Sequence, residues 1–323
     1  AQALSPAAAP RPVEVALLAS VFVVAACGLV YELAAGALAS YVLGDSVLQF
    51  STVIGTYLFA MGIGSWLSRF FERQLPAHFL RIELLVGLVG GLMPAFLFVA
   101  HASLPADGVL PFRVLLYGLV LLVGVLVGLE IPLVMRILKR NVALKDLVSQ
   151  VLTFDYLGAL GVSIAFPLLL VPQLGLIRTS LVFGMMNIAV AGWALWLFRG
   201  ELRLLRSHLV ATLACFALLL FAFFNADRIT RFSEDRYYAD NVIYAASSPY
   251  QRIVVTQRRA GDDGSVRLWL NGNLQFHARD EYRYHEALVH PAMLAHGAPK
   301  SVLVLGGGDG MAVREVLRHP GVE

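Results

Sequence analysis

A glycine-rich turn near the carboxyl end of the chain, GGGDG at residues 306–310, has the composition of a loop that binds a small ligand. Gly306, Gly308 and Gly310 can adopt positive φ angles and let the backbone approach a nucleoside, and the N–H groups of a following helix can bind an anionic part of it. The third glycine comes one residue earlier than in the G-x-G-x-x-G loops of dinucleotide-binding proteins, which favours an S-adenosylmethionine-type ligand. Asp309 repels phosphate and attracts an amine or a sulfonium. The turn therefore predicts a positively charged substrate; a glycine turn without a ligand is the alternative.

The segments around this turn predict a small β-region followed by the first βα unit of a doubly wound, Rossmann-like sheet. Short runs that alternate apolar and polar residues, separated by the turn sequence GDDG, predict a β-hairpin and a third short strand. From Asp280 the apolar residues recur at helical spacing, and Asp280 and Glu281 suit the amino terminus of a helix. A buried strand then precedes the glycine turn, and a helix follows it. The expected strands are residues 250–257, 266–272, 273–276 and 302–305, and the last expected helix is 311–317.

Four sequence blocks in this part of the chain resemble one enzyme family. In order, they are YQRIVV, LNGNLQF, DEYRYHEALVHPAMLAHG and VLVLGGGDGMAVREVLRHPGVE. They resemble the amino-terminal β-region and the first nucleotide-binding unit of the spermidine synthases, the polyamine aminopropyltransferases. The residues before them resemble the membrane-embedded bacterial branch of that family. The resemblance implies transfer of an aminopropyl group from decarboxylated S-adenosylmethionine to putrescine, which gives spermidine. A methyltransferase is the other enzyme class with such a turn, but the β-hairpin and the DEYRYHEA block argue against it.

The resemblance also implies roles for single residues. Gln251 corresponds to a glutamine that contacts the thioadenosine group, and Tyr284, His285 and Asp309 correspond to residues of the polyamine site. From the residues alone, Gln251 is equally a strand residue, Tyr284 a packing residue and His285 a polar residue on a helix surface. The resemblance implies decarboxylated S-adenosylmethionine as a co-substrate, no tightly bound cofactor, no metal, and a possible homodimer.

The catalytic base and the ribose-binding acid of that family have no counterpart in this sequence. In the resemblance, both follow later strands of the nucleotide-binding domain, beyond Glu323. A single βα unit cannot bury both faces of a sheet. The sequence therefore indicates either a domain truncated at its carboxyl end or a segment that other parts hold and that has no catalytic role. In both cases we expect this polypeptide alone to be inactive in aminopropyl transfer.

The composition of the chain excludes an ordinary soluble enzyme. Of its 323 residues, 58% are hydrophobic and 15% are charged, whereas soluble domains have about 45–50% and about 25%. A helix needs about 20 apolar residues to cross a bilayer, and the sequence contains seven such runs, so we expect a seven-helix membrane domain in contact with lipid. The runs are residues 15–43, 50–70, 80–100, 114–138, 151–171, 180–198 and 208–224. The expected organisation is a tail (1–14), the membrane domain (15–225), the β-region (226–279) and an incomplete nucleotide-binding domain (280–323).

The basic residues predict which side of the membrane each end of the chain faces. Lys and Arg are enriched in short cytoplasmic loops, and here they gather in the second, fourth and sixth loops. These residues are Arg69, Arg73, Arg81, Arg136, Lys139, Arg140, Lys145, Arg199, Arg203 and Arg206. With seven crossings, we expect the amino terminus in the cytoplasm and everything after residue 225 outside a bacterial inner membrane. If the shortest run, residues 208–224, only lies in the interface, the residues after it are instead expected in the cytoplasm. The net charge of +3 gives no indication of nucleic-acid binding.

Three acidic residues, Glu32, Glu130 and Asp155, lie within the apolar runs. An ionisable group in a bilayer costs about 2.5–3.5 kcal/mol on insertion scales and normally faces the interior of the helix bundle. One interpretation is a path for cations or protons, or a polyamine-binding cleft. The alternative function is therefore a polyamine or cation transporter, or a polyamine-binding membrane protein. The other is that each carboxyl group is protonated or hydrogen-bonded and only fixes the packing of the helices.

Overall fold

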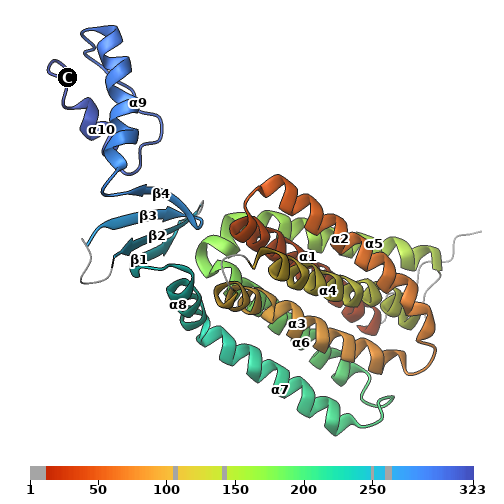
Figure 1. The fold of residues 1–323 in the computed structure, drawn as a ribbon. Helices are drawn as coiled ribbons and strands as arrows, with labels where there is room; N and C mark the ends of the chain where they lie inside the picture. Colours follow the sequence, from red (N-terminus) through yellow and green to blue (C-terminus); the bar gives the residue numbers. More distant parts are fainter. Residues whose placement is uncertain (1–11, 105–107, 140–143, 249–250, 259–263) are drawn as a thin grey trace, which may run out of the picture. The chain divides into compact units, whose positions relative to one another are not determined.

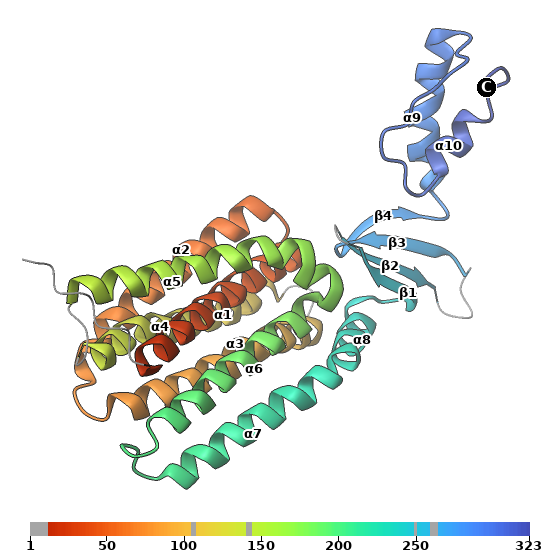
Figure 2. The same ribbon diagram turned by 180° about the vertical axis from the view of Figure 1, so that it is seen from behind.

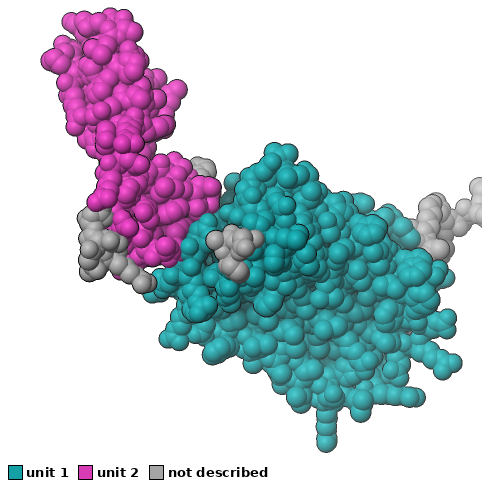
Figure 3. Space-filling model, in the orientation of Figure 1, with its two compact units in different colours: residues 1–237 teal, residues 238–323 magenta. Residues whose placement is uncertain are grey.

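The computed structural model describes residues 12–104, 108–139, 144–248, 251–258 and 264–323. The chain divides into two compact units, residues 1–237 and residues 238–323 (Figure 3). The described part of unit 1 is helical, and that of unit 2 holds an antiparallel sheet and two helices. The division falls after Tyr237, so residues 226–237, which the sequence analysis assigned to the β-region, belong to unit 1.

Unit 1 consists of long helices that pack side by side (Figure 1). Long apolar segments form helices because a helix satisfies its own backbone hydrogen bonds, which lipid cannot do. Six helical segments are long and apolar enough to cross a membrane by length and composition. The helices are α1 (Pro12–Leu43), α2 (Ser46–Leu67), α3 (Leu75–Ser103), α4 (Val109–Leu138), α5 (Leu144–Ala165), α6 (Val171–Leu197), α7 (Leu205–Phe224) and α8 (Ala226–Tyr237).

The fifth candidate span contains two of the seven predicted runs, so seven separate spans are not confirmed. It is a helical segment of 51 residues, Leu147–Leu197. A π-helical turn (Phe166–Leu170) and a positive φ of 74° at Gly175 interrupt it, and the ribbon turns back there in both views (Figures 1 and 2). Leu147 of α5 and Ala194 of α6 share one buried cluster. The two arms of this span, α5 and α6, are therefore antiparallel.

The first helix of unit 1 begins at the end of the bundle opposite to α8. Leu17, near the start of α1, shares a buried cluster with Phe79, near the start of α3. At the far end of α3, the ring of His101 lies 5.0 Å from the ring of Tyr237 in α8. Helix α3 is 29 residues long, about 44 Å at 1.5 Å per residue. Because α1 begins at one end of unit 1 and α7 leads into α8 at the other end, the chain from α1 to α7 crosses the length of unit 1 an odd number of times.

Glycines allow two pairs of helices in unit 1 to pack closely. Gly87 and Gly91 on α3 face α6, where a Cβ atom at Gly87 would lie 2.8 Å from the carbonyl oxygen of Gly184. Gly124 and Gly128 on α4 face α2 in the same way. Small residues spaced four apart permit such backbone approach between membrane helices.

Unit 2 begins with a four-stranded antiparallel sheet in the order β1-β2-β3-β4. The strands are β1 (Asn241–Ser247), β2 (Arg252–Gln257), β3 (Val266–Leu270) and β4 (Asn273–His277). The hairpin of β2 and β3 and the short third strand β4 confirm the prediction. Strand β1 was not predicted. Helices α9 (Glu281–His296) and α10 (Met311–Val316) follow the sheet.

The strand predicted at residues 302–305 does not form, and this is a correction. The side chain of Val304 packs against the buried cluster of α9 and α10. Leu303 and Leu305 are 82% and 86% exposed. A strand of a doubly wound sheet needs neighbouring strands for its backbone hydrogen bonds, and none pairs with these residues in the described part of the chain. The doubly wound sheet is therefore absent from the described residues, although the helices on both sides of the glycine turn are present.

The close packing of α2 and α4 can be tested with two glycines on the same helix. A Cβ atom at Gly128 would collide with the backbone of Met61, whereas one at Gly118 would meet no atom within 4 Å. We expect Gly128→Ala to destabilise unit 1 by about 1–3 kcal/mol, as overpacked cores do. Gly118→Ala serves as the control and should be neutral or slightly stabilising. Thermal unfolding of the detergent-solubilised protein measures both; equal unfolding temperatures for the two variants would contradict the packing described.

Candidate functional site in unit 2

Two residues predicted to bind a polyamine, His285 and Asp309, come together in unit 2. His285 lies on α9, and Asp309 lies in the glycine turn that precedes α10. The His285 Nε2 atom is 3.6 Å from the Asp309 Oδ2 atom. The side chain of His285 is buried, and that of Asp309 is partly exposed. A carboxylate and an imidazole therefore meet where α9 passes the glycine turn.

An ion pair between Glu281 and Arg314 joins α9 to α10. Arg314 donates two hydrogen bonds to Glu281, from Nη1 to Oε1 at 2.9 Å and from Nη2 to Oε2 at 3.0 Å. Such bidentate pairs fix the relative geometry of their partners. The hydrogen bonds from Arg314, together with one from His285, lower the pKa of Glu281 below its ordinary value of 4.5. Glu281 is therefore ionised at neutral pH.

Two oxygen atoms of Glu281 determine which nitrogen of His285 donates a hydrogen bond. The His285 Nδ1 atom lies 2.7 Å from Oε2 of Glu281 and 2.8 Å from the carbonyl oxygen of Glu281. Both oxygens only accept hydrogen bonds, so Nδ1 is the donor. In the neutral ring, Nε2 then has a lone pair that faces the carboxylate of Asp309. Two neighbouring acceptors suit a positively charged N–H donor, and an ammonium group is such a donor.

The glycine turn has the backbone angles that its composition predicts at most positions. Gly306, Gly307 and Gly310 have φ angles of +87°, +63° and +74°, which other residues rarely adopt. Gly308 has an ordinary φ angle, so its predicted role does not depend on a positive one. The Oδ1 atom of Asp309 accepts a hydrogen bond from the backbone N–H of Met311 at 3.0 Å. This bond holds the Asp309 carboxylate at the start of α10.

The two other predicted site residues lie in different surroundings. The ring of Tyr284 is exposed and stands edge-on to the ring of His285, with 5.1 Å between the ring centroids. Gln251 lies in the connection between β1 and β2, where its backbone N–H donates to the Oγ atom of Ser248 at 3.0 Å. The structure therefore brings Tyr284, His285 and Asp309 together and places Gln251 on a separate element.

Glu281 and Arg314 were not predicted as site residues. The sequence does allow the contact between Glu281 and His285 to be predicted, because the two residues are four positions apart and share one face of a helix. Arg314 follows Glu281 by 33 positions, and no local spacing indicates their contact. Only the packing of α9 against α10 reveals the pair.

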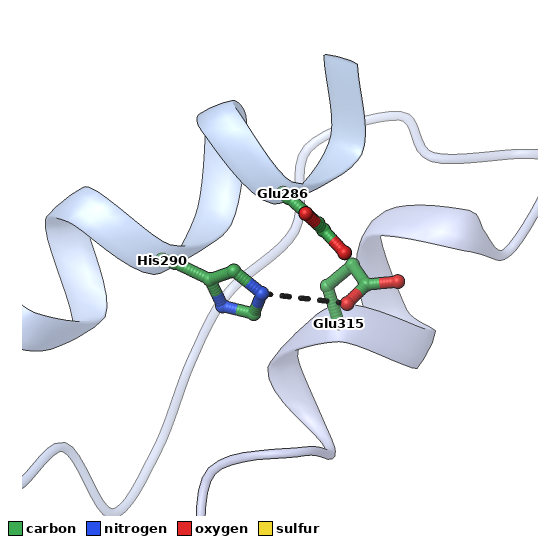
Figure 4. A group of neighbouring side chains, drawn as sticks. All are labelled: Glu286, His290 and Glu315. Carbon is green, nitrogen blue, oxygen red and sulfur yellow. Dashed lines mark ion pairs between the residues drawn. The ribbon is translucent and has the colours of Figure 1, made fainter. Parts of the chain in front are cut away.

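A second group of side chains between α9 and α10 has the composition of a metal site, which the sequence analysis did not anticipate. Glu286, His290 and Glu315 each place a ligand atom within 4.8 Å of the others (Figure 4). Glu315 is fully buried and already pairs with the guanidinium groups of Arg314 and Arg318, each at 2.7 Å. A metal ion would have to compete with two cations for the same carboxylate. The donor set therefore does not fit a resident metal.

The acidic residues predicted in the apolar runs differ in their burial. Glu130 is fully buried in unit 1, whereas Glu32 and Asp155 are only half-buried. Glu83 of α3 is also fully buried. It was not predicted, because it follows Arg81 near the beginning of its apolar run.

Comparisons with known proteins agree with the family resemblance. Residues 281–323 match the spermine/spermidine synthase domain. The chain is 56% identical to polyamine aminopropyltransferase 1 of Ralstonia nicotianae, over 98% of this chain and 60% of that protein. It is 50% identical to polyamine aminopropyltransferase of Leptospira interrogans, over 96% and 60%, and 43% identical to that of Mycobacterium tuberculosis, over 95% and 59%. The chain thus spans about 60% of the length of these curated relatives. No solved structure matches it.

The ion pair between Glu281 and Arg314 should make the contact of α9 and α10 sensitive to acid. A carboxylate whose pKa is lowered by folding stabilises the fold above its unfolded pKa, and this contribution is lost as the pH falls through the folded value. Glu281→Gln should therefore speed amide hydrogen exchange in residues 281–317 several-fold at neutral pH. The difference from the wild type should shrink below pH 4.5, the ordinary glutamate value.

Glu286→Gln is the matched control, because Glu286 lies on the same helix and makes only a longer contact, 3.6 Å, with Arg318. Hydrogen exchange followed by mass spectrometry resolves the segment. A Glu281→Gln difference that persists unchanged in strong acid would contradict the assignment.

Proposed function

We propose that this chain belongs to a membrane-embedded aminopropyltransferase of the spermidine synthase family, which transfers an aminopropyl group from decarboxylated S-adenosylmethionine to putrescine and forms spermidine. The single observation that carries the proposal is the pairing of Asp309 with His285 beside the glycine turn, 3.6 Å apart. The 50–57% identity to proteins named polyamine aminopropyltransferase supports it. The same identities support a spermidine synthase-like enzyme in preference to a methyltransferase.

The reaction requires a neutral amine beside a positively charged sulfonium. The amine nitrogen forms a bond to the carbon next to sulfur, the carbon–sulfur bond breaks, and its electron pair stays on sulfur to give methylthioadenosine. The attacking amine loses a proton, although a free primary amine holds it up to a pKa of about 10. A site for this reaction therefore needs carboxylates that bind ammonium groups and acceptors that orient the amine.

In the proposal, Asp309 and His285 bind the cationic part of the ligands. The carboxylate of Asp309 supplies the negative charge, and Nε2 of His285 supplies a second acceptor. Glu281 and Arg314 act as positioning residues, because Glu281 accepts the hydrogen bond from Nδ1 of His285 and Arg314 holds the Glu281 carboxylate. The glycine turn and Gln251 approach the adenosine part, and Tyr284 borders the amine. The proposal assigns no catalytic base to the described residues.

Unit 1 is proposed to anchor the enzyme in the inner membrane with seven crossings, the fifth candidate span supplying two of them. Described residues beside the three basic loops, Phe79, Leu138 and Phe198, share one buried cluster at one end of unit 1. The Nη1 atom of Arg136, at the end of α4, donates to the carbonyl oxygen of Ser68, just after α2, at 2.8 Å. Phe198, just after α6, shares a buried cluster with Leu17 at the start of α1. Charge in the loops thus supports a cytoplasmic amino terminus, and α8 at the opposite end supports an outward-facing unit 2.

The binding role of Asp309 can be tested by activity. Asp309→Asn keeps the size of the side chain and removes its charge. We therefore expect kcat/KM for putrescine to fall about 10- to 100-fold, which corresponds to the free energy of one hydrogen bond to a charged group. Asp280→Asn removes an exposed carboxylate at the start of α9 and should leave kcat/KM near the wild-type value. Spermidine formation is measured with a purified enzyme whose nucleotide-binding domain includes the later strands and the catalytic base of the family, because this polypeptide alone is expected to be inactive. Wild-type kinetics in Asp309→Asn would exclude this site as the amine-binding site.

The proposed orientation can be tested by cysteine labelling on intact cells. In a background that lacks Cys215, Ala278→Cys places a thiol on the surface of unit 2, and Gly200→Cys places one between α6 and α7; both positions are exposed, whereas Cys27 is buried. A membrane-impermeant maleimide should label Ala278→Cys directly and Gly200→Cys only after permeabilisation. The reverse pattern would place unit 2 in the cytoplasm, where decarboxylated S-adenosylmethionine is made.

A further inference from the structure

Two carboxyl groups in the interior of unit 1 have no hydrogen-bond partner. Glu83 on α3 is 0% exposed and Glu130 on α4 is 1% exposed. None of their four carboxylate oxygens accepts or donates a hydrogen bond within the described part of the chain. Val86, one turn along α3 from Glu83, and Leu133, one turn along α4 from Glu130, belong to the same buried cluster, which brings the two carboxyl groups near each other. They therefore form one buried acidic pair, which the enzyme site in unit 2 does not use.

Further polar groups from two other helices face this pair and are also unpartnered. Asn187 on α6 is 0% exposed, and neither atom of its amide group has a partner among the described residues. Its Cβ atom lies against Gly87, one turn along α3 from Glu83. The hydroxyl group of Tyr31 on α1 is likewise buried without a partner, and Tyr31 interacts electrostatically with both carboxyl groups.

Burying polar groups without hydrogen-bond partners costs free energy, so a cluster of such groups indicates a bound ligand that satisfies them. A buried amide or hydroxyl group without a hydrogen bond costs about 1–3 kcal/mol in proteins, and an isolated charge costs far more. Two neighbouring carboxylates in a medium of low polarity do not both ionise, because one proton is shared between them. The pair therefore carries a single negative charge at most, surrounded by amide and hydroxyl oxygens. Oxygen atoms are the ligands that hard cations prefer.

We propose that Glu83, Glu130 and Asn187 form a binding site for one small monovalent cation inside unit 1, either an alkali-metal ion or a primary ammonium group. One carboxylate balances the charge of the cation, and the other carboxyl group remains protonated and donates to a neighbouring oxygen. Oδ1 of Asn187 and the hydroxyl oxygen of Tyr31 complete the set of acceptors. The site is separate from the residues proposed to bind the substrates and does not depend on aminopropyl transfer.

The set of residues also refines the prediction made from the sequence. Glu130 belongs to the site, and Glu83 replaces the two other predicted residues. Glu32 and Asp155 are half-buried, and neither has a buried polar atom without a partner in the described part of the chain. Asp155 contributes only an electrostatic interaction with Glu130.

The experiment is thermal unfolding of the purified full-length protein in detergent, titrated with salts at constant ionic strength. Sodium, potassium and methylammonium chlorides are the probes, and choline chloride, whose cation is too large and offers no N–H donor, is the reference. We expect at least one probe to raise the unfolding temperature by about 2–4 °C in a saturable manner. Saturation by sodium or potassium identifies a metal ion, and saturation by methylammonium alone identifies an ammonium group.

Variants assign the effect to the site. Glu83→Gln and Glu130→Gln keep the shape of the side chains and should abolish the saturable shift. Glu72→Gln removes an exposed carboxylate of the same unit and should retain it. If a Gln variant fails to fold, infrared difference spectra of the wild type with and without the probe cation replace it, because binding must change the carboxyl bands. The proposal is overturned if every probe behaves as choline does, if Glu83→Gln and Glu130→Gln both keep the shift, or if the carboxyl bands do not change.

Discussion

The bidentate ion pair between Glu281 and Arg314 is the interaction on which the candidate site in unit 2 depends. It joins the first turn of α9 to α10, the two helices on either side of the glycine turn. Through the hydrogen bond that Nδ1 of His285 donates to the Glu281 carboxylate, it also orients a buried imidazole. The carboxylate and the carbonyl oxygen of Glu281 both accept from Nδ1 of His285, so in the neutral ring Nε2 faces Asp309 as a lone pair. A surface ion pair is usually worth little to stability; here its effect is on geometry.

The sequence predicted Asp309 and His285 for one site, and the structure brings them together, but the residues that support them were not predicted. Asp309 and His285 could be found because a charged residue inside a glycine turn and a family-like block are local signals. Glu281 and Arg314 could not, since their contact depends on how two helices pack across 33 positions of sequence. The strand expected at residues 302–305 failed for a related reason. An apolar run indicates a buried strand only if neighbouring strands supply hydrogen bonds, and local pattern carries no information about those neighbours.

In unit 1, hydrophobicity predicted the helices and left their arrangement undetermined. The seven runs correspond to helical segments, but the fifth and sixth belong to one span that turns back at Gly175. Burial of charge was equally hard to foresee. Glu83 lies two residues after Arg81, which makes it resemble a residue at the membrane surface, whereas α3 begins earlier, at Leu75, and carries Glu83 into the interior. The glycine pairs were more informative, because the absence of a side chain has the same meaning in any helix that packs closely.

The two units treat buried carboxylates in opposite ways. In unit 2, Glu281 and Glu315 are each paired with arginine, which reduces the cost of their charge, and Asp309 beside them is partly exposed. In unit 1, Glu83 and Glu130 have no cationic partner among the described residues. Removing one partner from a buried charge pair normally destabilises a protein strongly. Two neighbouring buried carboxyl groups without a cationic side chain are therefore compatible with a stable fold only if a proton or a bound cation balances their charge. The difference between the units therefore separates carboxylates that organise the fold from carboxylates that are free to bind.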